Sequence, residues 1–282
     1  MKKKLNFEQV FILIVMIGLF IFIAMPVWTA ISISFMSNAE SLSPSNYFIP
    51  ADFSLEGYKA VFEDANIIRP LINTLFVTSI GTLLHMLIVS LAGYGLIQTK
   101  LPGGKFIAIF FMITMMVPAE AIMIPRFLMF QNLGMINNLW SIILISLASG
   151  FSILLLENYF KSISFSLAES ARIDGASEFK IYYKIYVPLA KNGFLVVMLF
   201  DIVTRWNEYS SALLLLTDPN KYLIQQAIKE LVLPTGGGQS TFMIYPNLEM
   251  AVIVIGILPI VILYFMFQKQ FVGGMNVGGV KE

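Results

Sequence analysis

Residues 169–188 read ESARIDGASEFKIYYKIYVP, a polar and charged stretch in a chain that is otherwise strongly apolar. The apolar segments on either side, at about 136–157 and 191–217, exceed the ~20 residues that an α-helix needs to cross a bilayer. A water-exposed segment between two membrane spans is accessible to a soluble protein on that side of the membrane. The position of the stretch therefore predicts a docking element within a membrane protein.

The composition favours lipid as the medium around the chain. Of 282 residues, 57% are hydrophobic and 12% are charged, well below the ~25% charged residues of soluble domains. One soluble core cannot hide so much apolar surface in a chain of this size. The net charge of +1 gives no reason to expect a nucleic-acid partner. With no Cys and one His, disulfides and Cys metal sites are excluded, and a His-ligand metal centre is not expected.

Six apolar segments are long enough to be transmembrane helices, and none alternates as a β-barrel strand would. They are residues 10–35, 70–97, 105–124, 136–157, 191–217 and 247–268. Pro118 and Glu120 interrupt the third, so five spans with a re-entrant third segment remain an alternative. The first segment is longer than the ~7–15 apolar residues of a signal peptide, which predicts a retained anchor. We therefore expect an all-α membrane protein, with residues 1–282 forming a single transmembrane domain.

The Lys and Arg residues predict the orientation of these spans. With the N-terminus in the cytoplasm, 12 of the 18 Lys and Arg residues fall in inner segments, 5 fall in outer segments, and Arg205 lies inside the fifth span. The outer five are Lys59, Arg69, Arg126, Lys221 and Lys229. Because basic residues are enriched in cytoplasmic loops, both termini and residues 158–190 are expected in the cytoplasm.

Within that loop, residues 167–188, which we call the elbow, read as helix, turn and helix. Gly175 follows a breaker-free run at a position that suits a helix end. An exposed aromatic face is predicted on the second helix by residues at three- and four-residue spacing, namely Phe179, Tyr182, Tyr183 and Tyr186. Pro188 should end that helix before the fifth span. Such a face suits a protein partner, and a helix lying on lipid headgroups is the alternative from the pattern alone.

The elbow resembles the EAA loop of ABC importer permeases. That loop has the pattern Glu-Ala-Ala, three residues, Gly, nine residues, Ile, one residue and Leu-Pro. The matching positions here are Glu169, Ala171, Gly175, Ile185 and Pro188. Ser170 replaces the first Ala and Val187 replaces the Leu, and both replacements remain small or aliphatic. Five matched positions over twenty residues favour a docking element over a helix lying on lipid headgroups.

Further segments are similar to the carbohydrate-uptake branch of that family, and most of all to its MalG-type subunits. They are residues 116–118, 124–125, 133–137, 206–209 and 278–281, while residues 73–75 and 92–94 resemble the start of the family's conserved permease core. The resemblance covers nearly the whole chain. It implies the type I ABC importer permease fold, with six transmembrane helices and a cytoplasmic coupling helix between the fourth and fifth spans.

The resemblance implies a permease subunit of an ATP-driven sugar importer, forming half of the translocation path in the cell membrane. Its partners would be a sister permease, two cytoplasmic ATPase subunits and an extracytoplasmic sugar-binding protein. The implied docking residues are Glu169, Ala171, Asp174, Gly175, Ile185 and Pro188. Ala171 and Gly175, four residues apart, are expected on one helical face. ATP and Mg would be bound by the ATPase, because the P-loop-like run around Lys105 lacks the first Gly and the hydroxyl residue.

Polar residues in and beside the spans are candidates for the sugar path, because such residues are costly in lipid. The candidates are Asp201, Arg205, Trp206, Asn207, Glu208, Tyr209 and Glu120. The spacing of Asp201, Arg205 and Glu208 predicts one shared helical face, either as an internal charge ladder or as a lining of the path. Aromatic rings and amides beside them suit sugars. The resemblance places Glu120 in a bent stretch close to where a binding protein docks, and a solvated loop carboxylate is the alternative.

Two further residues carry expectations about structure. His85 is expected to be a hydrogen-bonded residue inside the helix bundle rather than a ligand. Asn73 is expected to cap the second span with its side-chain oxygen.

Other functional classes fit the sequence less well. A secondary transporter would show an inverted repeat, and none is visible. A membrane enzyme would need a nucleophile beside a base or a metal cluster, and with His85 as the single His the sequence offers neither. Permeases for glycerol phosphate or polyols remain an alternative within the family. A phosphate would favour cations in the path, and Arg205 is the one cation in the interior of a predicted span, so an uncharged or mixed oligosaccharide is expected.

Overall fold

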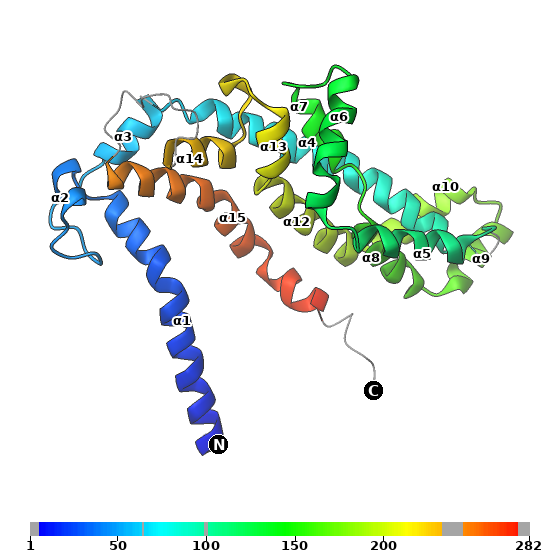
Figure 1. Cartoon of the computed structure of the whole chain (residues 1–282). Coiled ribbons are helices and arrows are strands. Elements are labelled where there is room, and N and C mark those ends of the chain that lie inside the picture. The colour runs from blue at the N-terminus through cyan, green and yellow to red at the C-terminus, as the bar shows by residue number, and fades with distance from the viewer. Residues whose placement is uncertain (1–5, 64, 99–100, 233–244, 276–282) are drawn as a thin grey trace. The chain divides into compact units, whose positions relative to one another are not determined.

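The computed structural model describes residues 6–63, 65–98, 101–232 and 245–275, and these residues contain helices and no strand. The contacts divide the chain into two compact units. Unit 1 consists of residues 1–68 and 227–259, and unit 2 consists of residues 69–226 and 260–282. Figure 1 labels the helices along the chain. The candidate functional residues lie in unit 2.

Unit 1 contains a long exposed helix and a small polar anchor. Its helices are α1 (Phe7–Ser34), α2 (Asn38–Leu42), α3 (Glu56–Glu63) and the first part of α15 (Pro246–Met275). The apolar side chains of α1 are exposed over most of its length, as expected for a helix surrounded by lipid. The amide of Asn247, at the start of α15, donates to the Met36 carbonyl at 3.0 Å and to Asn38 Oδ1 at 2.9 Å. This amide fixes the chain that leaves α1.

Unit 2 contains the remaining helices. In its first half they are α4 (Ile68–Leu96), α5 (Gly104–Met115), the 3₁₀ turn η1 (Ala119–Ile122), α6 (Met123–Asn132), α7 (Leu139–Ile145) and α8 (Gly150–Lys161). In its second half they are α9 (Phe165–Ile173), α10 (Glu178–Ile181), η2 (Tyr182–Tyr186), α11 (Val187–Leu189), α12 (Lys191–Trp206), α13 (Ser210–Leu215) and η3 (Pro219–Lys221). Helix α14 (Ile224–Val232) begins in unit 2 and ends in unit 1.

Three helices among the described residues are long and apolar enough to cross a membrane, namely Phe7–Ser34, Ile68–Leu96 and Pro246–Gln268. Three bent pairs bring the number to six if each pair is one span. The bends are 94° between α5 and η1–α6, 51° between α7 and α8, and 80° between residues 178–189 and α12. Segments 105–124 and 136–157 are therefore each divided by a bend, and segment 191–217 is divided because α12 ends at Trp206 and α13 begins at Ser210. At the first bend, Pro118 lacks an N–H and disfavours a helical residue before it.

Asn73 also differs from its expected role. It lies inside α4, which begins at Ile68, so it does not cap that helix. Its amide instead donates to the carbonyls of Asn220 and Tyr222, each at 3.0 Å. The side chain thus fastens α4 to the segment that follows α13.

Candidate functional site

The first arm of the elbow ends in a glycine with a left-handed backbone. Gly175 has φ +79°, a conformation that costs other L-residues about 1–2 kcal/mol. Its N–H donates to the Arg172 carbonyl at 3.0 Å, and the next N–H, of Ala176, donates to the Ala171 carbonyl at 2.9 Å. This pair of bonds closes α9. We expected Ala171 and Gly175 on one helical face. This expectation is wrong, because α9 ends at Ile173 and Gly175 lies beyond it.

Space is not what requires glycine at this position. A Cβ placed on Gly175 would meet no atom of the chain within 4 Å. The requirement for glycine within this chain is therefore the backbone conformation, which sets the angle between the two arms of the elbow.

The second arm runs without interruption through α10, η2 and α11. Ser177 caps it by accepting a hydrogen bond from the Lys180 N–H at 3.4 Å. The turn η2 is a π-helix, in which the Val187 N–H donates to the Tyr182 carbonyl. A wider turn before Pro188 gives its ring room next to the carbonyl four residues earlier. Pro188 therefore lies within the helical arm and does not end it as expected, and the chain turns at Ala190.

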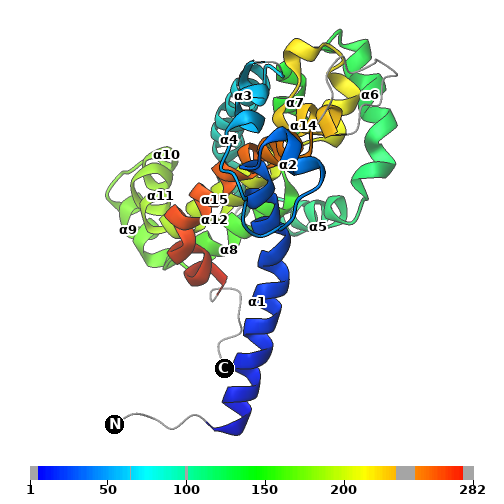
Figure 2. The same cartoon turned by 90° about the vertical axis from the view of Figure 1, so that its left-hand side faces the viewer.

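The predicted aromatic face is divided between the interior and the surface. Tyr182 and Tyr186 are 7% and 3% exposed and pack with Tyr94 and Phe160, with ring centroids 5.1–6.3 Å apart. The other two members of the stripe, Phe179 and Tyr183, are 70% and 63% exposed. The expectation of one wholly exposed face is therefore wrong, because the elbow folds back against α4 and α8. Figure 2 shows α9, α10 and α11 lying together.

The six predicted docking residues differ in exposure. Glu169, Asp174, Gly175 and Pro188 are exposed, whereas Ala171 and Ile185 are half-buried and pack against the core of unit 2. One exposed residue was missed. Ile173 is 83% exposed at the end of α9, next to Asp174. The sequence signal for such a residue is an apolar side chain on a polar helix at a position outside the helix's buried face.

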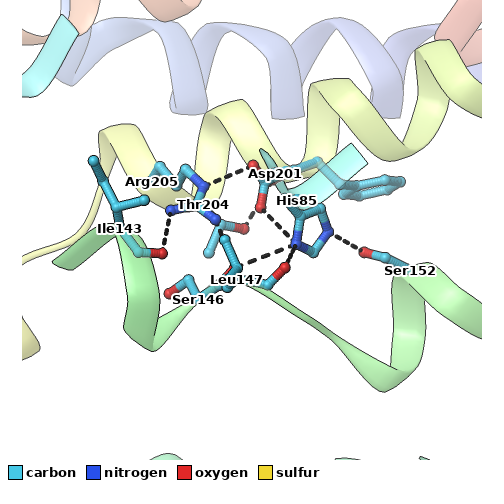
Figure 3. A network of polar contacts seen from close by, with 9 residues as sticks. His85, Ile143, Ser146, Leu147, Ser152, Asp201, Thr204 and Arg205 are labelled. Carbon is cyan, nitrogen blue, oxygen red and sulfur yellow. Dashed lines mark hydrogen bonds and ion pairs between the residues drawn. The ribbon is translucent and has the colours of Figure 1, made fainter. Parts of the chain in front are cut away.

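Asp201 and Arg205 form a buried ion pair rather than a lining. Arg205 Nε donates to Asp201 Oδ2 at 2.7 Å, and the two residues are 2% and 7% exposed. The guanidinium also donates from Nη2 to the Ser146 carbonyl at 2.6 Å and from Nη1 to the Ile143 carbonyl at 3.4 Å. Figure 3 shows these contacts. The carbonyls belong to the bend between α7 and α8, so the arginine compensates for backbone bonds that the bend removes.

His85 completes this network from α4. Its Nδ1 lies 3.2 Å from the carbonyls of Ser146 and Leu147 and 3.6 Å from Asp201 Oδ1. Since carbonyls only accept, Nδ1 carries a proton, and Nε2 lies 3.0 Å from the Ser152 hydroxyl. The expectation that His85 is a hydrogen-bonded bundle residue agrees with this geometry (Figure 3).

A glycine on α4 makes room for the guanidinium. A Cβ at Gly81 would lie 2.4 Å from Arg205 Nη1. Any larger residue would push Arg205 away from the bend, so Gly81 is required here by close approach.

Four of the five remaining path candidates line a cleft of about 480 Å³ in unit 2. Glu120 in η1 contributes to one wall, and Asn207, Glu208 and Tyr209 contribute to another. Arg126 of α6 also lines the cleft and was not among the candidates. Trp206, by contrast, is 2% exposed and does not line it. The cleft therefore holds two carboxylates, one guanidinium, an amide and a phenol ring.

Glu208 is separated from the other two charges because α12 ends at Trp206. Its Oε1 accepts from the Ser211 N–H at 2.8 Å and so satisfies a backbone donor in the first turn of α13. The predicted shared face therefore holds for Asp201 and Arg205 and fails for Glu208. Over the described residues, no group of three His, Asp or Glu side chains lies close enough together to hold a metal ion.

Comparison with known proteins adds a family and several relatives. Residues 97–277 match the family described as binding-protein-dependent transport system inner membrane component. The polygalacturonan/rhamnogalacturonan transport system permease protein YtcP of Bacillus subtilis is 34% identical over 265 residues, which cover 91% of this chain and 92% of that protein. The diacetylchitobiose uptake system permease protein NgcG of Streptomyces coelicolor is 27% identical over 253 residues, covering 89% and 82%.

A solved structure is similar over almost the whole chain. It is described as a bacterial ABC transporter involved in the import of the acidic polysaccharide alginate. The matching chain is 28% identical, with a TM-score of 0.85, and the match covers 95% of this chain and 99% of that one. The fold of this chain is therefore that of an ABC importer permease.

Proposed function

Because the chain belongs to the family of binding-protein-dependent transport system inner membrane components, we propose that it forms half of the translocation path of an ATP-driven sugar importer. As a transporter component of that family, it is not an enzyme. The relatives are named as permeases for oligosaccharides or polysaccharides, which supports a sugar as the substrate. In this proposal the bent pairs α5–α6 and α7–α8, together with α12 and α13, complete six spans with both termini in the cytoplasm, and residues 178–189 belong to the cytoplasmic elbow.

The observation that carries the proposal is the geometry of the elbow. Its tip presents an exposed apolar side chain, Ile173, beside two exposed carboxylates, Glu169 and Asp174. An apolar centre with a charged rim is the composition of a protein-docking surface. We assign this tip to a cytoplasmic ATPase subunit whose facing surface is apolar with a cationic rim. Ala171 and Ile185 would support the tip from inside the elbow, since both pack against unit 2.

The other partners follow from the same proposal. The chain would pair with a sister permease, and two ATPase subunits would bind ATP and Mg. An extracytoplasmic binding protein would deliver the sugar. The chain would itself hold no cofactor.

The cleft is proposed as this chain's contribution to the sugar path. The Tyr209 ring suits the face of a sugar, and Asn207 and Glu120 suit its hydroxyl groups. Two carboxylates face one guanidinium, that of Arg126, which favours an uncharged or mixed oligosaccharide over a phosphate-bearing substrate. A permease for glycerol phosphate or polyols is the alternative within the family. An ion-coupled secondary transporter is the less favoured alternative, because the family, the relatives and the solved structure are those of binding-protein-dependent or ABC transport systems.

Replacing Tyr209 by alanine should lower sugar uptake at low sugar concentration by roughly tenfold, the change that about 1.4 kcal/mol produces. The measurement is ATP-dependent uptake of labelled oligosaccharides by proteoliposomes that contain the whole complex and its binding protein. Tyr209→Phe, which keeps the ring, should lose less.

Leu213→Ala is the matched control, because Leu213 lies on the adjacent helix α13, is 45% exposed and does not line the cleft. Normal uptake by Tyr209→Ala across an oligosaccharide panel would remove the cleft from the path. Uptake of glycerol phosphate in place of every sugar would favour the alternative.

A further inference from the structure

An ion pair joins the two arms of the elbow across its turn. Arg172 lies near the end of α9 and Glu178 begins α10. Arg172 Nε donates to Glu178 Oε1 at 2.6 Å, and Nη2 donates to Oε2 at 3.1 Å. The pairing is therefore bidentate, which fixes direction as well as distance. It holds the arms at one angle.

The same two side chains bond to the end of α4. The Tyr94 hydroxyl donates to Glu178 Oε2 at 2.8 Å, and Arg172 Nη2 donates to Gln98 Oε1 at 3.1 Å. Tyr94 is in the last turn of α4 and Gln98 follows that helix. Arg172 and Glu178 thus share two bonds within the elbow, and each makes one further bond, Glu178 to α4 and Arg172 to Gln98 just beyond its end.

Burial shows that this arrangement is not the main support of the elbow. The side chains of Arg172 and Glu178 are 30% and 54% exposed, and exposed ion pairs contribute little to stability. The buried Tyr182 and Tyr186 supply the apolar contact, and the Tyr182 hydroxyl is 2.7 Å from that of Ser90 on α4. The polar contacts at the turn therefore add direction to an attachment that already exists.

We propose that Arg172, Glu178, Tyr94 and Gln98 form a clamp through which movement of the elbow is transmitted to α4. The inference rests on the proposed function, since it requires an ATPase that moves the elbow. The four residues are positioning residues that touch neither ATP nor sugar. The hydrogen bond from Arg172 lowers the pKa of the Glu178 carboxyl, so the carboxylate is charged at neutral pH.

The test is the number of sugar molecules transported per ATP hydrolysed by the whole complex in proteoliposomes. Tyr94→Phe removes one hydroxyl and keeps the ring in the aromatic cluster. We expect the transport-to-ATP ratio to fall about threefold to tenfold, since the lost hydrogen bond is charge-assisted. Co-purification of the ATPase and its ATP hydrolysis should stay normal, which a loss of folding would not allow.

Tyr186→Phe is the matched control. Tyr186 is buried in the same cluster, and its hydroxyl makes no hydrogen bond recorded among the described residues. Its ratio should equal that of the wild type. Gln98→Leu serves as a second variant, with an expected smaller fall, because it removes the bond from Arg172 and a long 3.5 Å bond to the Tyr94 carbonyl, and keeps the bond from Tyr94 to Glu178.

The outcomes separate the clamp from the proposed function. A wild-type complex that transports sugar with ATP, together with a Tyr94→Phe variant whose ratio is unchanged, would overturn the clamp alone. A wild-type complex without ATP-dependent uptake would overturn the proposed function and the clamp with it.

Discussion

Replacing Arg205 by methionine should destabilise the chain by about 3–5 kcal/mol, the usual cost of leaving a buried charge without its partner. Asp201 would lose its cation while 7% exposed. The carbonyls of Ser146 and Ile143, at the bend between α7 and α8, would lose their donor as well. The measurement is the free energy of unfolding of the purified chain in detergent micelles, from denaturant titration followed by helix content.

Two controls isolate the cause. Arg126→Met makes the same chemical change at a half-buried arginine with no ion pair recorded among the described residues, and should cost less than about 1 kcal/mol. Asp201→Leu combined with Arg205→Met removes both charges, so it should recover part of the loss. An Arg205→Met chain as stable as the Arg126→Met chain would show that the bend does not depend on this network.

Replacing Gly175 by leucine should abolish most ATP-dependent transport, because a leucine at φ +79° is strained and the elbow would relax to another angle. Gly175→Asn is the matched variant, since asparagine has a similar branched shape and tolerates the left-handed conformation far better. We expect it to keep most transport. The measurements are ATPase co-purification and sugar uptake in the same preparations.

The two variants distinguish the reasons for a glycine. If transport is lost in Gly175→Leu and kept in Gly175→Asn, the backbone conformation is the requirement. If both variants lose transport while the elbow stays folded, the requirement is close approach of a partner. A Cβ at Gly175 meets no atom of its own chain within 4 Å, so the clash would have to come from another subunit. Normal transport by both variants would remove Gly175 from the docking role.

Local patterns predicted the parts of this structure that depend on neighbours in sequence. The apolar runs located both ends of α1 and α4 to within three residues and the start of α15 to within one, while α15 continues to Met275. The turn at Gly175 followed from a glycine placed after a breaker-free run, and the structure confirms its left-handed backbone.

Contacts between distant residues account for what the sequence did not reveal. Tyr182 and Tyr186 are buried because α4, about ninety residues earlier, packs against them; a periodic stripe alone cannot tell which members meet another helix. Glu208 does not share the helical face of Asp201 and Arg205, because α12 ends at Trp206. No Pro or Gly marks this boundary in the sequence.

The bend between α7 and α8 illustrates the same limit. It is stabilised in place by Arg205 and His85, which lie in other helices. Without those partners in view, residues 136–157 read as one continuous apolar segment. The clamp residues were missed for a similar reason, since Tyr94 and Glu178 are 84 positions apart.

The most direct test of ATPase docking uses the absence of cysteine from the chain. Ile173→Cys, labelled with a benzophenone maleimide, would place a photo-crosslinker at the exposed tip of the elbow in an otherwise label-free subunit. Ala51→Cys, exposed in unit 1, is the control. After illumination of the whole complex in membranes, we expect the label at position 173 to link this chain to an ATP-hydrolysing subunit, and the label at position 51 not to do so. Crosslinking from position 173 to lipid alone, in a complex that still imports sugar with ATP, would contradict the docking role of the elbow.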